Sequence, residues 1–482
     1  MRVAILGFSD QEQSESLPIY QYFKTQNADI TAFYWGESKL PDEVHKVKID
    51  KSAVIDNLSG FDLIVRGPAV HPRQIRSDTP VTSLTDIFIK ESPSKNVVGV
   101  TGTKGKGTTS TLVAKMLEAQ LSTHSTDAQG RSEGTRRATS SSQGGKKIWL
   151  GGNIGKPLLD NLKEIKPEDW IVLEMSAGQL ITFTGRIHVG VCLMVVPEHM
   201  DWHTDMEEYT NAKANLFKHQ SPEDIAIYFA GNETSVRVAG QSPGKKVPYY
   251  QKPGAYVRHD GMIVIGDDET EVVHKSEIKL LGEHNLQNIC AALTTVSEAL
   301  GGLDPFDSPP SGGSLRVNPE PVEWIDKAKA VLHSFSGLEH RLELVRESEG
   351  VKYYDDSFAA TPDSAIVALE AIPGKKVIIL GGFDRNLPIE HLAKAVKEHS
   401  GDLLKAVLIG AGAGRLAKEL DEIGFNNYEI PRAKNMTEIV SSAKRFAKPG
   451  SSVVLSPGFT SFDMFKNFVD RGDQFKDVVN QL

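Results

Sequence analysis

The 482-residue chain contains only two cysteines, Cys192 and Cys290, and each lies inside an apolar run. Two isolated thiols exclude a disulfide framework and a thiolate metal site, and they are typical of a reducing compartment. The sequence also lacks an apolar stretch long enough to cross a membrane, and its N-terminus lacks the pattern of a secretory signal. We therefore expect a cytoplasmic protein with no membrane insertion.

Positive charge is also scarce. The chain has 54 lysines and arginines but 63 aspartates and glutamates, which gives a formal net charge of −9. This balance argues against a nucleic acid as the main partner. A small anionic substrate would have to be met by a few local basic groups. The length exceeds what one hydrophobic core supports and favours about three domains.

Strands and helices alternate along most of the chain, which predicts α/β domains with largely parallel sheets. We expect an N-terminal domain at 1–93, a central domain at 94–336 and a C-terminal domain at 337–482. Residues 122–147 contain no Val, Leu, Ile or Phe, so they indicate an insertion that cannot pack, although its arginines could alternatively cover bound phosphates. Residues 301–321 are rich in Gly, Pro and Ser and indicate a linker.

A glycine-rich turn lies between an apolar strand and a helix at residues 97–112, which read VVGVTGTKGKGTTSTL. Such a turn can aim several backbone N–H groups at a phosphate, and the helix that follows directs its positive end there. The spacing differs from the common phosphate-loop pattern, because an extra glycine follows the lysine. The residues expected to bind ATP here are Gly102, Thr103, Lys104, Gly105, Lys106, Gly107, Thr108 and Thr109.

Polar residues follow the next two apolar runs of the central domain. Glu174 ends the run at 170–173, while His199, Asp201 and His203 follow the run at 191–196. The carboxyl end of a parallel strand is where α/β enzymes place metal ligands. A helix cap or a solvated loop would explain the same residues without a metal.

A lysine lies on the apolar face of a predicted helix. Thr204 and Glu207 have the spacing of a capping box, which would begin the helix. The apolar stripe then comprises Met206, Tyr209, Lys213, Leu216 and Phe217. Lys213 either extends along its methylene stem to solvent or is desolvated with a lowered pKa. A neutral amine could take up CO₂ and become an anionic carbamate that binds Mg²⁺.

Taken in order, these motifs resemble the Mur ligase family of ATP-dependent amide-forming enzymes from about residue 97 to the end. The segments that carry the resemblance are VTGTKGKGTT, GGNIGKPL, LEMSAGQL, PEHMDWH with AKANLF, GEHNLQNICAAL, GLEHRLE, DDSFAATPDS and SPGFTSFDMFKNFVDRGDQF. The last segment is similar to the branch that adds D-glutamate to UDP-N-acetylmuramoyl-L-alanine in peptidoglycan precursor synthesis. The N-terminal part matches less closely, through Gly7-Phe8-Ser9 and the RGPAV segment at 66–70.

The resemblance implies a fold and a set of site residues. The fold would have a Rossmann-like UDP-binding domain, a central P-loop ATPase domain and a Rossmann-like C-terminal domain. The catalytic residues would be Lys106, Glu174, His199, Lys213, Arg341 and Asp356. Mg²⁺ would be held by Thr108, Glu174, His199 and carbamylated Lys213. ATP would also contact Asn285, Asn288, Arg341 and Asp356. The substrate residues would be Phe8, Ser9, Gly67, Asn153, His199, Arg385, Ser461 and Phe468.

The implied reaction transfers the γ-phosphate of ATP to a carboxylate, and an amine then displaces the phosphate from the acyl phosphate. The reactants would be UDP-N-acetylmuramoyl-L-alanine and D-glutamate, with ATP and Mg²⁺, and the enzyme would act as a monomer. Domain closure would exclude water from the acyl phosphate.

Two departures keep other functions open. The family's D-glutamate ligases read D-S-K-A-T-N-P where this chain has Phe358 in place of the lysine, and the same segment resembles the sister enzyme that adds a D-alanyl-D-alanine dipeptide. The GTKGKGT turn is closer to folylpolyglutamate synthase. A nucleotide-binding regulator without ligase activity is a further alternative, although it would not need a metal-bridging Lys213.

Overall fold

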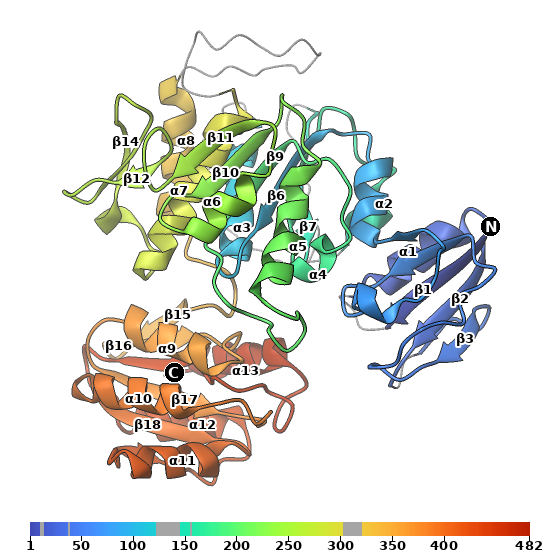
Figure 1. Cartoon of the computed structure of the whole chain (residues 1–482). Helices are drawn as coiled ribbons and strands as arrows, with labels where there is room; N and C mark the ends of the chain where they lie inside the picture. The colour runs from blue at the N-terminus through green and yellow to red at the C-terminus, as the bar shows by residue number, and fades with distance from the viewer. Residues whose placement is uncertain (10–13, 37–38, 122–144, 155–156, 302–320) are drawn as a thin grey trace. The chain divides into compact units, whose positions relative to one another are not determined.

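The computed structural model describes residues 1–9, 14–36, 39–121, 145–154, 157–301 and 321–482. The chain forms two compact units (Figure 1). The first comprises residues 1–277 and 286–333, and the second comprises residues 278–285 and 334–482. The predicted boundary near residue 93 falls inside the first unit and stays a prediction, and most of the predicted insertion at 122–147 lies outside the described residues.

The first unit begins with a five-stranded parallel sheet of order β3-β2-β1-β4-β5. The central strand β1 has four consecutive buried residues, because both faces of the sheet are covered. The strands are β1 (Arg2–Phe8), β2 (Asp29–Tyr34), β3 (His45–Lys48), β4 (Leu63–Arg66) and β5 (Val81–Thr82). The helices are α1 (Ser16–Lys24), η1 (Pro72–Gln74) and α2 (Leu84–Glu91).

A six-stranded parallel sheet of order β11-β10-β9-β6-β8-β7 follows. Because β6 is first in sequence and lies between β8 and β9, the strand order reverses beside it, and ligands of such sheets bind at that carboxyl edge. The strands are β6 (Asn96–Thr101), β7 (Ile148–Gly152), β8 (Trp170–Glu174), β9 (Val189–Cys192), β10 (Ile225–Phe229) and β11 (Lys245–Tyr249). The helices are α3 (Lys106–Leu121), η2 (Leu158–Asn161), α4 (Ala177–Leu180), α5 (Met206–Lys218), α6 (Glu233–Ala239), α7 (Glu283–Ala299) and α8 (Pro321–Ser334).

An antiparallel sheet of three strands extends the first unit, and the sequence analysis did not predict it. It comprises β12 (Tyr256–Val257), β13 (Met262–Ile265) and β14 (Thr270–His274), followed by η3 (Lys275–Glu277). The C-terminal bound predicted for the insertion, residue 147, is too late, because Lys147 is already bonded to the folded domain. Its N–H donates to Asp169 Oδ1 at 2.8 Å, and its carbonyl accepts from Trp170 N at 2.9 Å.

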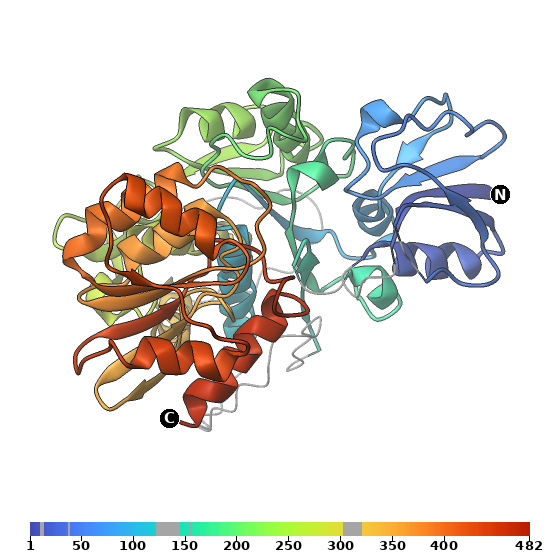
Figure 2. The ribbon, with the colours of Figure 1, turned by 90° about the horizontal axis from the view of Figure 1, so that it is seen from below.

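The second unit contains a six-stranded sheet of order β15-β16-β20-β17-β18-β19, parallel except for the edge strand β15. Helices cover both faces, with α9 to α11 packed on one core and α12 and α13 on the other (Figure 2). The strands are β15 (Glu343–Ser348), β16 (Val351–Asp355), β17 (Lys376–Gly381), β18 (Leu403–Ile409), β19 (Tyr428–Glu429) and β20 (Ser452–Leu455). The helices are α9 (Pro362–Ala371), α10 (Glu390–Glu398), η4 (His399–Gly401), α11 (Ala413–Glu422), α12 (Met436–Lys444) and α13 (Phe468–Asn480).

These sheets confirm the predicted α/β class with parallel sheets. Among the helices of the described ranges, none is long and apolar enough to span a bilayer.

Candidate functional site

The phosphate loop joins the end of β6 to the start of α3 at the centre of the second sheet. Gly102 and Gly105 have φ angles of 142° and 86°, which side chains rarely allow. A Cβ on Gly102 would lie 2.6 Å from the Leu193 Cβ, and one on Gly105 would lie 2.1 Å from the Asn288 Oδ1. Both glycines are therefore required by the path of the loop, and Asn288 packs directly against it.

Lys106 begins α3 and folds back over the loop. Its Nζ donates to the carbonyl of Thr103 at 2.8 Å and to that of Gly102 at 3.2 Å. The helix α3 includes the extra glycine, Gly107, in its first turn. The lysine and the positive end of α3 thus act at one place, which favours a bound phosphate.

Lys213 is buried on the inner face of α5, with 1% of its surface exposed. Its Nζ lies 4.3 Å from the centre of the Tyr209 ring and donates to the Gly102 carbonyl at 2.8 Å. The interpretation that the side chain reaches solvent is therefore wrong. Burial, with the positive charge of Lys106, lowers the pKa of Lys213 to about 7.

The cap of α5 differs from the predicted pair Thr204 and Glu207. The N-cap residue is Asp205, whose carboxylate accepts from the Glu208 N–H at 2.8 Å. The Glu208 carboxylate in turn accepts from the Thr204 N–H at 2.8 Å. The capping arrangement is shifted by one residue, because aspartate offers an equally good acceptor one position later.

Glu174 and Asn153 are brought together at the carboxyl ends of β8 and β7. The Asn153 Nδ2 donates to Glu174 Oε1 at 3.1 Å, and the Asn153 N–H donates to the Glu174 carbonyl at 2.8 Å. Gly152 permits this approach, since a Cβ there would lie 2.2 Å from the Glu174 carbonyl oxygen. The predicted metal carboxylate and the predicted substrate amide thus lie beside each other.

His199 lies in the loop between β9 and α5 with a φ of 57° and a side chain that is 67% exposed. Its carbonyl accepts from the N–H groups of Trp202 and His203 at 3.0 and 2.9 Å, which fixes the turn. The imidazole Nε2 lies 3.7 Å from Glu198 Oε2. The imidazole of His199 is therefore accessible to a ligand.

The structure also joins His71, His203 and Glu208, which the sequence analysis did not group. Glu208 Oε1 lies 3.2 Å from His71 Nε2, and Glu208 Oε2 lies 3.4 Å from His203 Nδ1. The His71 Nδ1 accepts from the Arg73 N–H at 3.2 Å, so the proton of a neutral ring is on Nε2. A metal-bound Nε2 needs the opposite tautomer. Glu208 thus lies close to two imidazoles, and this tautomer of His71 does not suit a metal on Nε2.

Two overlapping groups around His340 in the second unit also have metal-ligand spacing, formed with Glu339 and Asp473 or with Glu343 and Asp355. A lysine already supplies the positive charge there, since Lys476 Nζ lies 2.6 Å from Glu339 and 3.3 Å from Glu343. Among the described residues, neither Glu174 nor His199 belongs to a group of three potential ligands. Mg²⁺ does not require such a cage, because it uses phosphate and water oxygens as well.

The predicted UDP-binding turn follows β1. Gly7 has a φ of 78°, and a Cβ there would lie 2.8 Å from the Val70 side chain. The Gly67 N–H donates to the carbonyl that precedes Gly7 at 2.9 Å, and Ser9 N–H donates to the Ser16 hydroxyl at 3.1 Å. Phe8 is buried, so its side chain packs in the core and is not accessible to a ligand.

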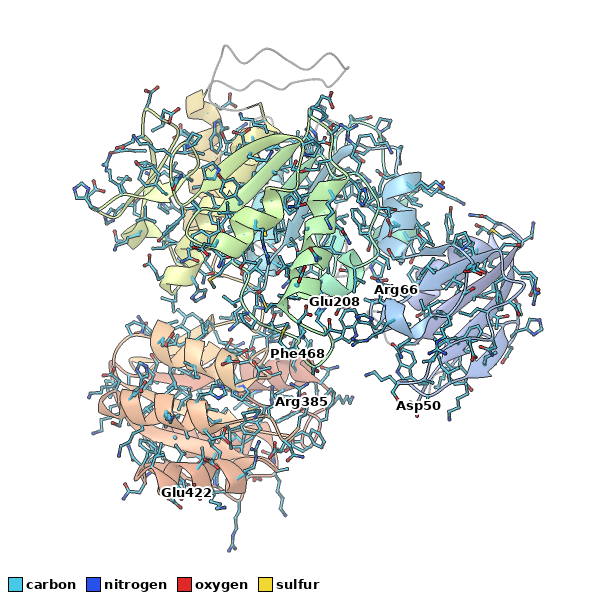
Figure 3. All side chains as sticks on the ribbon, in the orientation of Figure 1. Asp50, Arg66, Glu208, Arg385, Glu422 and Phe468 are labelled. Atoms are coloured by element: carbon cyan, nitrogen blue, oxygen red, sulfur yellow. The ribbon has the colours of Figure 1, made fainter. Side chains whose placement is uncertain are left out.

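Arg66 is a residue that the sequence analysis treated only as part of a turn. It is fully buried at the end of β4 and donates to the carbonyls of Gly178 at 2.6 Å and Val70 at 2.7 Å. Burial lowers its pKa to about 10. Figure 3 labels Arg66 and also Glu208 on α5. Gly178 lies 112 residues after Arg66 in the sequence, so no local pattern could indicate this contact.

In the second unit, Asp356 is buried just after β16. It accepts from the Ser456 hydroxyl at 2.6 Å and from the Leu342 N–H at 3.2 Å. Burial raises the pKa of Asp356 to about 7 in spite of these bonds. The guanidinium carbon of Arg341 lies 3.8 Å from the centre of the Phe358 ring.

The remaining predicted residues of this unit differ in exposure. Arg385, labelled in Figure 3, is exposed. Its Nη2 donates to the Ala360 carbonyl at 3.4 Å, and both residues line a small hollow. Ser461 is buried, and its carbonyl accepts from Phe465 N at 2.9 Å. Phe468 begins α13.

The loop of Arg385 is fixed by its neighbours, since Arg415 donates two hydrogen bonds of 2.6 and 2.8 Å to Asp384.

Asn285 and Asn288, whose amides are predicted to contact the nucleotide, fall in different units. Asn285 Nδ2 donates to the Leu281 carbonyl at 2.7 Å in the second unit, whereas Asn288 packs on the phosphate loop of the first.

Two family descriptions match the chain, the Mur ligase middle domain over residues 100–296 and the Mur ligase glutamate ligase domain over residues 340–459. The UDP-N-acetylmuramoylalanine–D-glutamate ligase of Acetivibrio thermocellus is 36% identical over 100% of this chain and 96% of that protein. The protein of the same name from Clostridium kluyveri is 33% identical over 96% of this chain and 94% of that protein.

Solved structures show the same fold. The MurF ligase of Thermotoga maritima in complex with ADP covers 88% of this chain and 90% of its own at 19% identity, with a TM-score of 0.54. FolC of E. coli in complex with DHPP and ADP covers 83% of this chain and 92% of its own at 15% identity, with a TM-score of 0.52. Because the D-glutamate ligases of A. thermocellus and C. kluyveri are 36% and 33% identical over nearly the whole chain, the chain belongs to the Mur ligase family.

Proposed function

We propose that this chain is an ATP-dependent ligase that adds D-glutamate to UDP-N-acetylmuramoyl-L-alanine during peptidoglycan precursor synthesis. The observation that carries the proposal is the full-length match, at 30–36% identity, to proteins named UDP-N-acetylmuramoylalanine–D-glutamate ligase. The phosphate loop and the buried lysine beside it supply the chemistry that such a reaction needs.

The reaction has two steps. An oxygen of the L-alanine carboxylate attacks the γ-phosphorus of ATP, and the bond to the β-phosphate oxygen breaks to release ADP. The amine of D-glutamate then attacks the acyl carbon, loses a proton and expels phosphate, which leaves an amide. Lys106 and the backbone N–H groups at the start of α3 neutralise the charge on the phosphates, where both transition states concentrate it.

Mg²⁺ fits the residues at the carboxyl ends of β6 and β8. Glu174 presents a carboxylate there, Thr108 a hydroxyl at the start of α3, and His199 an accessible imidazole. The oxygen donors of Glu174 and Thr108 suit Mg²⁺, whereas the nitrogen of His199 would be a weaker ligand for this ion. When bound, the ion reduces the repulsion between the phosphates and the incoming carboxylate. Glu174 is kept in place for this task by its hydrogen bond from Asn153.

Lys213 would take part after a covalent change. Its buried amine has a pKa of about 7, so an uncharged fraction is present at neutral pH. That amine adds to CO₂ with loss of a proton and becomes a carbamate, which exchanges a buried positive charge for an anionic metal ligand. The carbamate nitrogen keeps one N–H, so Lys213 can still donate to the Gly102 carbonyl.

The residues of the second unit would act on ATP and on the amino acid. Arg341 and Asp356 would contact the nucleotide, while Arg385, Ser461 and Phe468 would contact D-glutamate. Arg385 is the exposed guanidinium of this group and can hold a carboxylate through two parallel hydrogen bonds. It would thus replace the lysine that Phe358 removes. We further propose that the enzyme is a cytoplasmic monomer.

The test is a panel of amines incubated with the alanyl precursor, ATP and Mg²⁺, with release of ADP as the signal. D-glutamate should give the highest turnover, and ADP release should require both the precursor and the amine. Preference for D-alanyl-D-alanine would assign the chain to the dipeptide-adding enzymes. Release of ADP with a folate and glutamate in place of the alanyl precursor would assign it to the folylpolyglutamate synthases. Nucleotide binding without turnover would identify a regulator.

A further inference from the structure

Phe358 stands where the family pattern has a lysine, and the structure gives it a different task. The ring is 42% exposed, yet one face is covered by the guanidinium of Arg341, whose central carbon lies 3.8 Å from the ring centre. The ring also meets that of Phe468 edge to face, with centres 5.1 Å apart and planes at 86°. Phe358 and Phe468 thus form an aromatic shelf under Arg341.

The backbone that carries Phe358 is fixed. Ser357 is fully buried, and its N–H donates to Asp355 Oδ1 at 2.9 Å. Its hydroxyl donates to the Phe468 carbonyl at 2.7 Å, which ties the two halves of the shelf together. Arg471 donates to the Ser357 carbonyl at 2.9 Å. The position of the Phe358 ring is therefore set by buried hydrogen bonds.

Arg341 comes from the same scaffold. It follows His340, whose Nδ1 lies 2.6 Å from the second carboxylate oxygen of Asp355 and whose carbonyl accepts from the Phe358 N–H at 3.0 Å. Gly472 leaves room for this histidine, since a Cβ there would lie 2.2 Å from the imidazole Nδ1. One buried group, Asp355, thus holds both the residue before Arg341 and the residue before Phe358.

The nature of the side chain at position 358 decides where the guanidinium goes. An aromatic face attracts a guanidinium and orients its plane, whereas an ammonium at the same place would repel it. The lysine of the family pattern is therefore incompatible with the observed position of Arg341.

We propose that Phe358 is a positioning residue, which together with Phe468 holds the Arg341 guanidinium in the orientation that it needs to stabilise the transferring phosphate. The inference rests on the proposed function for the group on which Arg341 acts. It also removes position 358 from recognition of the D-glutamate side chain and leaves that role to Arg385.

The test compares F358L, F358W and F358K. The leucine variant should lose about five- to tenfold in kcat with an unchanged KM for D-glutamate, because the shelf acts on phosphate transfer and not on the amine. The tryptophan variant should retain most of kcat, since it keeps an aromatic face. The lysine variant, which restores the family residue, should lose more than F358L.

A matched control is F446L, because Phe446 in the same unit also lies near a guanidinium, with the Arg445 carbon 5.5 Å from its ring centre. F446L should leave kcat unchanged. In an R341M background, F358L and F358W should have equal residual turnover. An F358K enzyme as active as the wild type, or a loss in F358L that is equally large in the R341M background, would overturn the proposal.

Failure of the proposed function is distinguishable from failure of this inference. If the wild type prefers another amine, the same series is measured with that amine. If no amine supports turnover, the fluorescence of F358W reports on the contact, because R341M should alter the emission of the new indole while leaving that of an F446W control unchanged. An emission of F358W that is unaffected by R341M would contradict the positioning role.

Discussion

Each of the two units buries an ionisable residue whose pKa burial moves to near neutrality, and the two pKa values move in opposite directions. The pKa of Lys213 in the first unit falls to about 7, and that of Asp356 in the second rises to about 7. Burial is the largest cause in both, because a low dielectric disfavours the charged form of either group.

The surroundings of the two groups differ. Asp356 accepts hydrogen bonds from Ser456 and Leu342, which favour its charged form and oppose the effect of burial. Lys213 instead lies near a second cation, Lys106, which lowers its pKa further. The aspartate is thus supplied with partners for its charge, whereas the lysine is poised to lose its own. The difference favours a neutral amine at Lys213, whereas the hydrogen bonds of Asp356 favour its carboxylate.

Lys376 shows that burial alone does not make a lysine functional. It is buried at the start of β17, and its Nζ donates to the Leu369 carbonyl at 3.0 Å, much as Lys213 donates to Gly102. Burial lowers the pKa of Lys376 as well. It lies away from any phosphate loop, so it serves as an internal reference for Lys213.

The largest effect is expected for K106A. It removes the positive charge that lowers the pKa of Lys213 and that we propose neutralises the phosphates of ATP. Turnover should fall by at least about a thousandfold while the fold is retained, because the lysine acts on phosphate charge. The control is K115A, an exposed lysine on the same helix. Near-normal ADP release by K106A would remove the phosphate loop from the account.

The second expected effect separates the two buried lysines. K213A and K376A should both lower the melting temperature, since each leaves a cavity. Only K213A should lose most of its turnover, by about a hundredfold or more, and a short carboxylate such as acetate should restore part of it. Wild-type activity of K213A in CO₂-depleted buffer would show that the two lysines are equivalent.

A smaller effect is expected for R385A, which tests whether the Arg385 guanidinium of the second unit binds a carboxylate of D-glutamate. Loss of a charge-assisted pair should raise the KM for D-glutamate by about tenfold or more, with little change in the KM for ATP. R432A, an exposed arginine of the same unit, is the control. Unaltered D-glutamate kinetics in R385A would assign the carboxylate to another group.

The last effect concerns Asp356 and is on stability rather than on turnover. Because its folded pKa is about 7, above the ordinary value of 3.8, the native state binds more protons than the unfolded state between these values. Its contribution to stability is fully present below about pH 4 and is lost as pH rises through 7, by at most about 4 kcal/mol.

D356N stays neutral and escapes this loss, so its melting temperature relative to the wild type should rise from pH 5 to pH 8. A constant difference between the two proteins over this range would show that Asp356 is not protonated in the folded state.

Much of the fold followed from local patterns in the sequence. The strand at Trp170–Glu174 was predicted with its observed bounds, because a buried apolar run ends there on a carboxylate. The place of Lys213 on a stripe with helical spacing left burial and extension to solvent both open, and the structure shows burial. The sheet of β12, β13 and β14 was missed because its strands are short. The helix α8 was missed although Trp324, Ala328 and Leu332 form an apolar stripe with helical spacing.

The parts of the site that escaped prediction depend on contacts between distant segments. His71 meets Glu208, and Arg66 meets Gly178, across more than 100 residues. The stacking of Arg341 on Phe358 is also tertiary, and the sequence showed only that a lysine was absent. Local spacing identifies which residues are chemically able to act, whereas the folded chain decides which of them meet.

The most direct test of the account is the fate of oxygen during turnover. The alanyl precursor is labelled with ¹⁸O in its terminal carboxylate and incubated with ATP, Mg²⁺ and D-glutamate. An acyl phosphate requires one labelled oxygen to leave with phosphate for each amide formed, and we predict this transfer. Amide formation with unlabelled phosphate would contradict the account.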